Sequence, residues 1–260
     1  MMLFVFEGKK TEPLIFKTLE KLYFPQDTEK TVCCFGCNIY ELYRLMNDSD
    51  FTEDIVSVIK NRLPNTQSSP LKNFTDVADF SEVFLFFDYD FQNKNLPPDE
   101  INRQLEKMLS FFDDETENGK LYVNYPMVES IKCTDKLPDS NFINYKATRS
   151  ECHNFKLFAT EKYPFYKSMD FMVIPCDKKT GLLKDISEEK YNFIKNNWKL
   201  LCSQHISKAN YICTENYAIP EKKDFVNQKK IFSKQLEKYV EPQDSVAILN
   251  SFPLFLYEYF

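Results

Sequence analysis

Residues 83–87 constrain the fold more than any other stretch of this sequence. They form a continuous run of five apolar residues, Val83 to Phe87, and lead directly into Asp88-Tyr89-Asp90. A short run that is apolar at every position is typical of a strand buried on both faces, as in a parallel sheet. We therefore expect a central strand here that ends in two acidic residues.

Three more stretches predict strands, and helical patterns separate all four. The expected strands cover residues 3–6, 31–35, 83–87 and 120–125. Helices are expected from Thr11, as an N-cap, to residue 24, from the N-cap Asn38 to residue 46, over 52–63, and from Pro97 to residue 109. This alternation predicts an α/β fold with a mostly parallel four-stranded sheet and right-handed crossovers over residues 1–130.

Residues 131–260 form a second region that we expect to be mainly helical, most strongly over 140–160, 188–212 and 226–240. It ends in an apolar tail, residues 246–260, that is rich in large side chains, among them Leu249, Phe252, Leu254, Phe255, Leu256, Tyr257, Tyr259 and Phe260. So much apolar surface is unfavourable in water. We expect the tail to pack on the core of the same chain or at a subunit interface. The second alternative would make the protein a homo-oligomer.

Charge is distributed unevenly between these regions. Residues 1–130 carry 13 basic and 23 acidic side chains, a balance of −10, whereas residues 131–240 carry 20 basic and 13 acidic ones, a balance of +7. A basic region is typical of a protein that binds a polyanion such as nucleic acid, and also of a solvated lysine-rich surface. Only 4 of the 33 basic residues are arginine, which favours phosphate contacts over base-specific reading.

Scarce glycine and histidine exclude several classes of enzyme. The four glycines lie far apart, so the phosphate-binding loops of P-loop ATPases, protein kinases and Rossmann dehydrogenases are absent from the sequence. The two histidines, His153 and His205, cannot form an HExxH zinc site.

Acidic residues follow three of the expected strands. Glu7 follows the first, Asp88 and Asp90 follow the third, and Glu129 comes shortly after the fourth. Strand alternation places Asp88 and Asp90 on the same side, and Glu12 in the next helix could reach the same place. Crowded carboxylates without histidine suit Mg²⁺ or Mn²⁺, so the sequence predicts a metal site. Taken singly, each residue also fits a helix cap or a turn.

The segments Leu3–Gly8 and Phe84–Asp90 together resemble the TOPRIM domain, with its strand-end Glu-Gly followed two strands later by Asp-x-Asp. That domain is shared by topoisomerases, primases, a ribosomal-RNA maturase and nucleases of the overcoming-lysogenisation-defect type. The run from Glu7 to Pro13 is more similar to the RloB-type, AbiL-type and PARIS-effector TOPRIM proteins of bacterial phage defence. The resemblance covers residues 1–130 and departs from the nuclease pattern at Thr11, where an acid often stands.

The resemblance implies a Rossmann-like TOPRIM catalytic domain that cleaves phosphodiester bonds with Mg²⁺ or Mn²⁺. Asp88 and Asp90 would be metal ligands, Glu7 a ligand or general acid/base, and Glu129 a further catalytic residue. Glu12 is an additional candidate ligand because of its position in the first turn of the next helix. It also implies an effector of anti-phage defence acting on tRNA, other RNA or DNA. The alternative is a catalytically weak sensor or binding subunit that acts only through a separately encoded ABC-type ATPase.

Lysines are expected to contact the nucleic acid. His205 and Lys208 lie three residues apart on one face of a basic helix, with Lys199 along the same helix. Lys9 and Lys10 lie in the loop beside Glu7 and offer an alternative contact with phosphate. An ordinary exposed helix face is the competing interpretation of the first three.

Cysteine usage and hydropathy indicate a reducing cytoplasm. The eight cysteines have no regular spacing, no signal peptide is recognisable, and no apolar stretch reaches the ~20 residues of a membrane helix. Cys34-Phe35-Gly36-Cys37 has the spacing of a redox or zinc site, or of two buried thiols. We expect a cytoplasmic protein without a membrane anchor.

Overall fold

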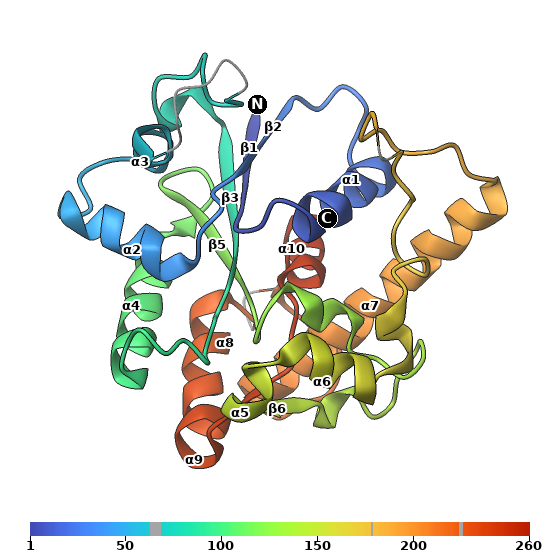
Figure 1. Cartoon of the computed structure of the whole chain (residues 1–260). Helices are drawn as coiled ribbons and strands as arrows, with labels where there is room; N and C mark the ends of the chain where they lie inside the picture. Colours follow the sequence, from blue (N-terminus) through green and yellow to red (C-terminus); the bar gives the residue numbers. More distant parts are fainter. Residues whose placement is uncertain (63–68, 178, 224–225) are drawn as a thin grey trace.

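The centre of the molecule is a five-stranded sheet in the computed structural model, which describes residues 1–62, 69–177, 179–223 and 226–260. The strand order is β2-β1-β3-β5-β4, so β3 lies in the middle (Figure 1). Four strands are parallel, as predicted: β1 (Met2–Phe6), β2 (Lys30–Cys34), β3 (Glu82–Asp88) and β5 (Gly119–Asn124). The short antiparallel β4 (Asp113–Asp114) is an addition that the sequence pattern did not predict.

Burial explains why β3 is apolar from Val83 to Phe87. It pairs with β1 on one side, with Leu3 opposite Val83, and with β5 on the other, with Leu85 opposite Leu121. Every side chain from Val83 to Phe87 is buried. Because the three strands are parallel, their carboxyl ends meet at one edge of the sheet.

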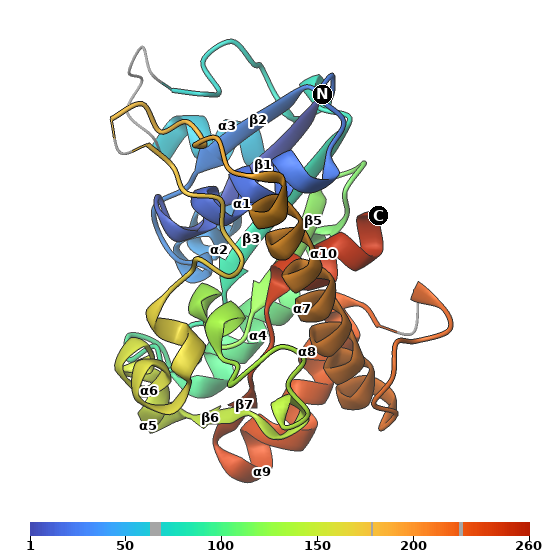
Figure 2. The same ribbon diagram turned by 90° about the vertical axis from the view of Figure 1, so that its right-hand side faces the viewer.

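Helices cover both faces of the sheet. On one side lie α2 (Ile39–Asp48), α3 (Ile55–Arg62) and α4 (Pro98–Phe111), and on the other α1 (Thr11–Tyr23) and α10 (Ser251–Tyr259), with the long α7 (Glu188–Thr214) next to α10 (Figures 1 and 2). Asn38 caps α2 as predicted, since its side chain accepts a hydrogen bond from the backbone N of Glu41. Thr11 is the first residue of α1 and not its cap, which is Lys10. Residue 63, the expected end of the helix after 52, lies outside the described residues.

The C-terminal region is less regular than predicted. Residues 140–160 do not form one helix, because a short strand interrupts them and pairs antiparallel with a second one. These elements are η3 (Phe142–Asn144), β6 (Lys146–Thr148), α5 (Arg149–Cys152), α6 (Phe155–Lys162) and the partner strand β7 (Ser245–Ala247). The remaining ones are η1 (Val77–Asp79), η2 (Val128–Lys132), η4 (Pro164–Lys167), α8 (Gln228–Gln235), the π-helical η6 (Leu236–Val240) and α9 (Glu241–Gln243).

The apolar tail packs on the core of its own chain. Phe252 stacks on Phe86 of β3 at 4.8 Å between ring centroids, and Phe255 packs edge-on against Phe84 at 5.1 Å. The first of the two alternatives for residues 246–260 is therefore confirmed. The two regions share one hydrophobic core, and the boundary at residue 130 stays a prediction. Among the described residues, no helix has the length and hydropathy to span a membrane.

The packing of α10 predicts a large stability loss for Phe255→Ala. Its ring is fully buried against the rings of β1 and β3, so we expect the free energy of unfolding to fall by about 3–5 kcal/mol. The matched control is Phe193→Ala, because Phe193 is 47% exposed, and there we expect a change within about 0.5 kcal/mol. Urea denaturation followed by circular dichroism measures both, and equal losses would contradict the assigned packing.

Candidate metal centre

The acidic residues predicted from the strand ends meet at the carboxyl edge of the sheet. This edge faces the segment with η2 and α6 (Figure 1). Glu7 directly follows β1, and its Oε2 accepts a hydrogen bond of 2.9 Å from the backbone N of Asp88 at the end of β3. Asp88 Oδ1 in turn accepts one of 3.0 Å from Asn124 Nδ2 at the end of β5. Three parallel strands thus place these groups side by side.

The Glu-Gly pair is explained by a close approach of Glu12. Its Oε1 accepts a hydrogen bond of 2.9 Å from the backbone N of Gly8. A Cβ at position 8 would lie only 2.7 Å from both carboxylate oxygens of Glu12. Glycine therefore lets the first turn of α1 bring this carboxylate back to the end of β1.

Asp90 reaches the same edge by a different route from the one predicted. β3 ends at Asp88, and Asp90 has a φ of +45°, which lies in the left-handed region. Strand alternation therefore does not place it, and that part of the prediction is wrong. Its Oδ1 accepts a hydrogen bond of 3.1 Å from Gln92 Nε2, and the backbone N of Asn93 donates to its carbonyl at 2.8 Å. The turn positions this carboxylate, and Asp tolerates such a conformation better than most residues.

Glu129 and a lysine that the sequence did not single out complete the acidic edge. Glu129, in η2, is only 5% exposed, and its Oε1 lies 2.9 Å from Lys156 Nζ of α6. The Lys156 side chain is 72% exposed, so its ammonium group can meet a ligand from solvent. The two residues are 27 positions apart, and no local pattern links them.

Burial and mutual repulsion raise pKa values among these carboxylates. Burial raises the pKa of Asp88 well above its usual range, and the charges of Glu7, Asp90 and Glu12 raise it further. Burial likewise raises the pKa of Glu7, with additional contributions from Asp90, Glu12 and Glu129. The pKa values of Glu12 and Asp90 are also raised, first by burial. The five predicted residues therefore interact electrostatically.

The chemistry of these five side chains suits a hard divalent cation. All five groups offer carboxylate oxygens, the ligands that Mg²⁺ and Mn²⁺ prefer. Within the described residues, however, no three His, Cys, Asp or Glu side chains are already arranged as a set of metal ligands. The carboxylates of Glu7, Glu12, Asp88 and Asp90 accept hydrogen bonds from donors of the protein, and Glu129 pairs with Lys156. Side-chain rotation is needed to gather them around one ion.

His205 and Lys208 do not form an exposed basic face. Both are fully buried in α7. His205 Nδ1 accepts a hydrogen bond of 3.1 Å from the backbone N of Asn250, while Lys208 Nζ donates to the carbonyl of Tyr145 and lies 4.6 Å from the ring centroid of Phe142. Burial lowers the pKa of both groups well below their usual values. Their predicted contact with nucleic acid is therefore wrong.

The other predicted lysines are exposed, and only two lie near the acids. Lys9 and Lys10 follow the Glu7-Gly8 turn directly. Lys199 and Tyr23 both line a cavity of about 240 Å³, and Tyr23 is the last residue of α1. Glu12 lies at the opposite end of that 13-residue helix, roughly 16 Å away along its axis at 1.5 Å per residue. Lys199 thus lies apart from the acidic edge.

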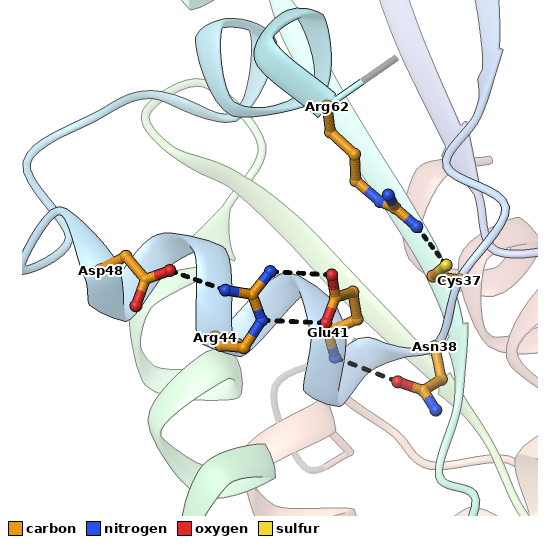
Figure 3. A network of polar contacts seen from close by, with 6 residues as sticks. All are labelled: Cys37, Asn38, Glu41, Arg44, Asp48 and Arg62. Atoms are coloured by element: carbon orange, nitrogen blue, oxygen red, sulfur yellow. Dashed lines mark hydrogen bonds and ion pairs between the residues drawn. The ribbon is translucent and has the colours of Figure 1, made fainter. Parts of the chain in front are cut away.

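The CxxC segment lies beside this edge, between β2 and α2. Cys34 and Cys37 are half-buried free thiols. Burial raises the pKa of Cys34, and the charge of Glu12 raises it further. Cys37 Sγ accepts a hydrogen bond from the Arg62 guanidinium (Figure 3). The redox, zinc and structural interpretations of this pair remain open.

Comparisons with known proteins give no neighbour for this arrangement. Neither a scan against protein-family models nor searches of curated proteins and of solved structures found a match. The resemblance to the TOPRIM domain therefore stays a prediction that depends on the motifs themselves.

The raised pKa values predict that, without divalent cations, the protein loses stability as the pH rises. Asp88 and Glu7 bind protons more tightly in the folded protein than in the unfolded chain, because their pKa values are raised by folding. Their contribution to the free energy of unfolding is therefore fully present below the ordinary pKa values of 3.8 and 4.5, and it is lost as the pH rises through the raised pKa values of the folded state. Asp88→Asn removes one charge and keeps an oxygen for Asn124. We expect its free energy of unfolding at pH 7 to exceed that of the wild type, because the variant has no buried charge at this position.

Urea denaturation in EDTA at pH 5 and pH 7 tests this expectation. Asp27→Asn is the matched control, because Asp27 is exposed and should leave the pH dependence unchanged. A wild type that gains stability between pH 5 and pH 7, or an Asp88→Asn variant with the pH dependence of the wild type, contradicts the electrostatic argument.

Proposed function

We propose that this chain is a nuclease of the TOPRIM type that depends on Mg²⁺ or Mn²⁺. The observation that carries the proposal is the convergence of five carboxylates from separate segments, the ends of β1 and β3, α1, the turn after β3, and η2. An exposed lysine of the neighbouring region, Lys156, lies against this cluster. Acids that repel one another at a sheet edge are retained where a cation offsets their charge.

Glu7, Glu12, Asp88 and Asp90 are the residues that would hold the metal. When bound, such an ion orients a phosphate, lowers the pKa of a water molecule and stabilises the leaving oxygen. Among the chain's own groups, Lys156 can neutralise charge on the phosphate from the solvent side. Glu129 holds this ammonium group at the cluster, and Glu7, whose pKa is raised first by burial, is the candidate for a general acid or base.

The substrate class and the biological role follow from the motif resemblance. Similarity of residues 7–13 to the TOPRIM proteins of phage defence supports an effector that cleaves tRNA, other RNA or DNA in the cytoplasm of an infected cell. The basic balance of residues 131–240 is consistent with a polyanionic substrate.

A second candidate function is a sensor or binding subunit that acts only through an ABC-type ATPase. One observation favours it: the carboxylates are engaged by hydrogen bonds within the protein and must rotate before they can share an ion. A partner that moves η2 or α6 against the sheet could drive this step, and the nucleotide chemistry would belong to the partner. Activity of the purified chain alone distinguishes the two candidates.

The first test measures metal binding and cleavage separately. We expect calorimetry to detect Mg²⁺ or Mn²⁺ binding to the wild type, and cleavage of tRNA or plasmid DNA to stop in EDTA. Asp88→Asn and Glu7→Gln should each lower cleavage about 100-fold or more, because each removes a charged oxygen from the cluster. Glu106→Gln, on the exposed side of α4, is the control. Absence of metal binding both alone and with an ATPase partner would refute the site.

The second test asks which lysine contacts the substrate. Lys156→Gln should weaken nucleic-acid binding and reduce the slope of log affinity against log salt concentration by about one, because one phosphate contact is lost. Lys199→Gln changes an exposed lysine of α7 that lies near Tyr23, away from Glu12, and it should bind like the wild type. Filter binding at several salt concentrations measures both. If Lys199→Gln is the weaker binder, the substrate does not approach the acidic edge from α6.

A further inference from the structure

A cavity of about 540 Å³ is lined in part by Tyr40, whose hydroxyl contacts the residue between Asp88 and Asp90. It lies between α2 and the segment that follows β3, with α4 forming a further wall. Its lining includes Asn38, Tyr40, Asn47, Asn93 and Gln104. This volume lies within the range typical of small-molecule sites and can accommodate a nucleoside.

Two hydrogen bonds join the cavity wall to the turn that carries the acids. The hydroxyl of Tyr40 donates to the carbonyl of Tyr89, the residue between Asp88 and Asp90. The backbone N of Asn93 donates to the carbonyl of Asp90 at 2.8 Å. Burial raises the pKa of Tyr40, and the charges of Asp90 and Glu7 contribute to the rise. A ligand in the cavity would therefore lie next to groups at the acidic edge.

The charged groups of this wall are paired with each other. Arg44 lies 3.0 Å from Glu41 and 2.9 Å from Asp48, in a ladder along α2 (Figure 3). The guanidinium charge is therefore already balanced by two carboxylates. Recognition in this cavity depends on hydrogen bonds and shape, which disfavours a phosphate and favours a neutral polar ligand.

Three asparagines of the lining have orientations that their partners determine. The oxygen of Asn38 accepts from the backbone N of Glu41 at 3.0 Å, as Figure 3 shows. The oxygen of Asn93 accepts from the backbone N of Asn95 at 2.8 Å, and that of Asn47 from Lys107 Nζ at 3.3 Å. Each partner can only donate, so the amide oxygen must face it. In the part of the chain that the structure describes, the three NH₂ groups have no hydrogen-bond partner.

We propose that this cavity binds a nucleobase through its carbonyl-bearing edge, as in uracil or guanine, beside the phosphate that the acidic cluster acts on. The proposal rests on the proposed nuclease function and adds a subsite to it. Amide NH₂ groups donate to base oxygens and ring nitrogens, and a base is neutral, planar and of suitable size. On the same wall, Gln104 Nε2 donates to Glu100, while Gln104 Oε1 is buried and finds no partner among the described residues. It offers an acceptor for a base N–H once the side chain turns outward.

The experiment measures binding of neutral nucleosides to the full chain in EDTA, by ligand-observed NMR. Uridine and guanosine are the probes, with adenosine and ribose 5-phosphate for comparison. Asn38→Asp and Asn93→Asp are informative variants, because Asp keeps the oxygen that accepts from the backbone and replaces the NH₂ donor by an acceptor. Asn227→Asp is the matched control, since Asn227 caps α8 in the same way outside the cavity.

We expect uridine or guanosine to bind more tightly than adenosine, and each cavity variant to weaken this binding about tenfold, the effect of one lost hydrogen bond. The control should bind like the wild type. Absence of nucleoside binding, wild-type affinity in both cavity variants, or binding of ribose 5-phosphate alone would overturn the subsite. Metal binding and cleavage are separate readouts, so a chain that cleaves without nucleoside binding refutes the subsite only, and one that binds nucleosides without cleaving refutes the nuclease only.

Discussion

Repulsion between buried carboxylates at the end of β3 is the constraint on which the rest of the molecule depends. Asp88 and Glu7 lie where burial and like charges both oppose ionisation. A chain can hold such groups together only on a rigid support. The aromatic contacts between β3 and α10 provide that support, because they attach the last helix of the chain to the same strand that presents the acids. The stability of the sheet thus maintains an arrangement in which buried like charges repel one another.

The sheet was predictable from sequence, whereas the route of Asp90 was not. The parallel strands follow from continuous apolar runs, since a strand covered on both faces needs apolar side chains on both. The acids at the strand ends then follow from geometry, because parallel strands end at one edge. The position of Asp90 could be predicted only from the conformation of the turn that follows β3. Its positive φ and its hydrogen bonds with Gln92 and Asn93 belong to that turn. Strand periodicity contains no information about such a turn.

Errors about the basic residues have a common physical cause. Helical periodicity identifies a face of α7, but it does not say which layer of the protein covers that face. His205 and Lys208 share a face that the C-terminal segments bury, with Asn250 and Tyr145 as their partners. Lys156 was missed for the converse reason, since its contact with Glu129 joins two elements through tertiary packing alone. The cavity of about 540 Å³ likewise gathers segments around residues 38–47 and 93–104, which no local pattern connects.

The contacts of Arg149 indicate how the C-terminal region completes the site. Its guanidinium lies 3.9 Å from the ring centroid of Phe91, donates to the carbonyl of that residue, and pairs with Asp244 at 2.8 Å. Phe91 follows Asp90 directly, so this arginine attaches the acidic turn to β6 and β7. Together with the Glu129–Lys156 pair it fixes the carboxyl edge of the sheet at two points. Residues 131–260 are therefore part of the structure that positions the acids, and any movement of this region relative to the sheet changes the distances between them.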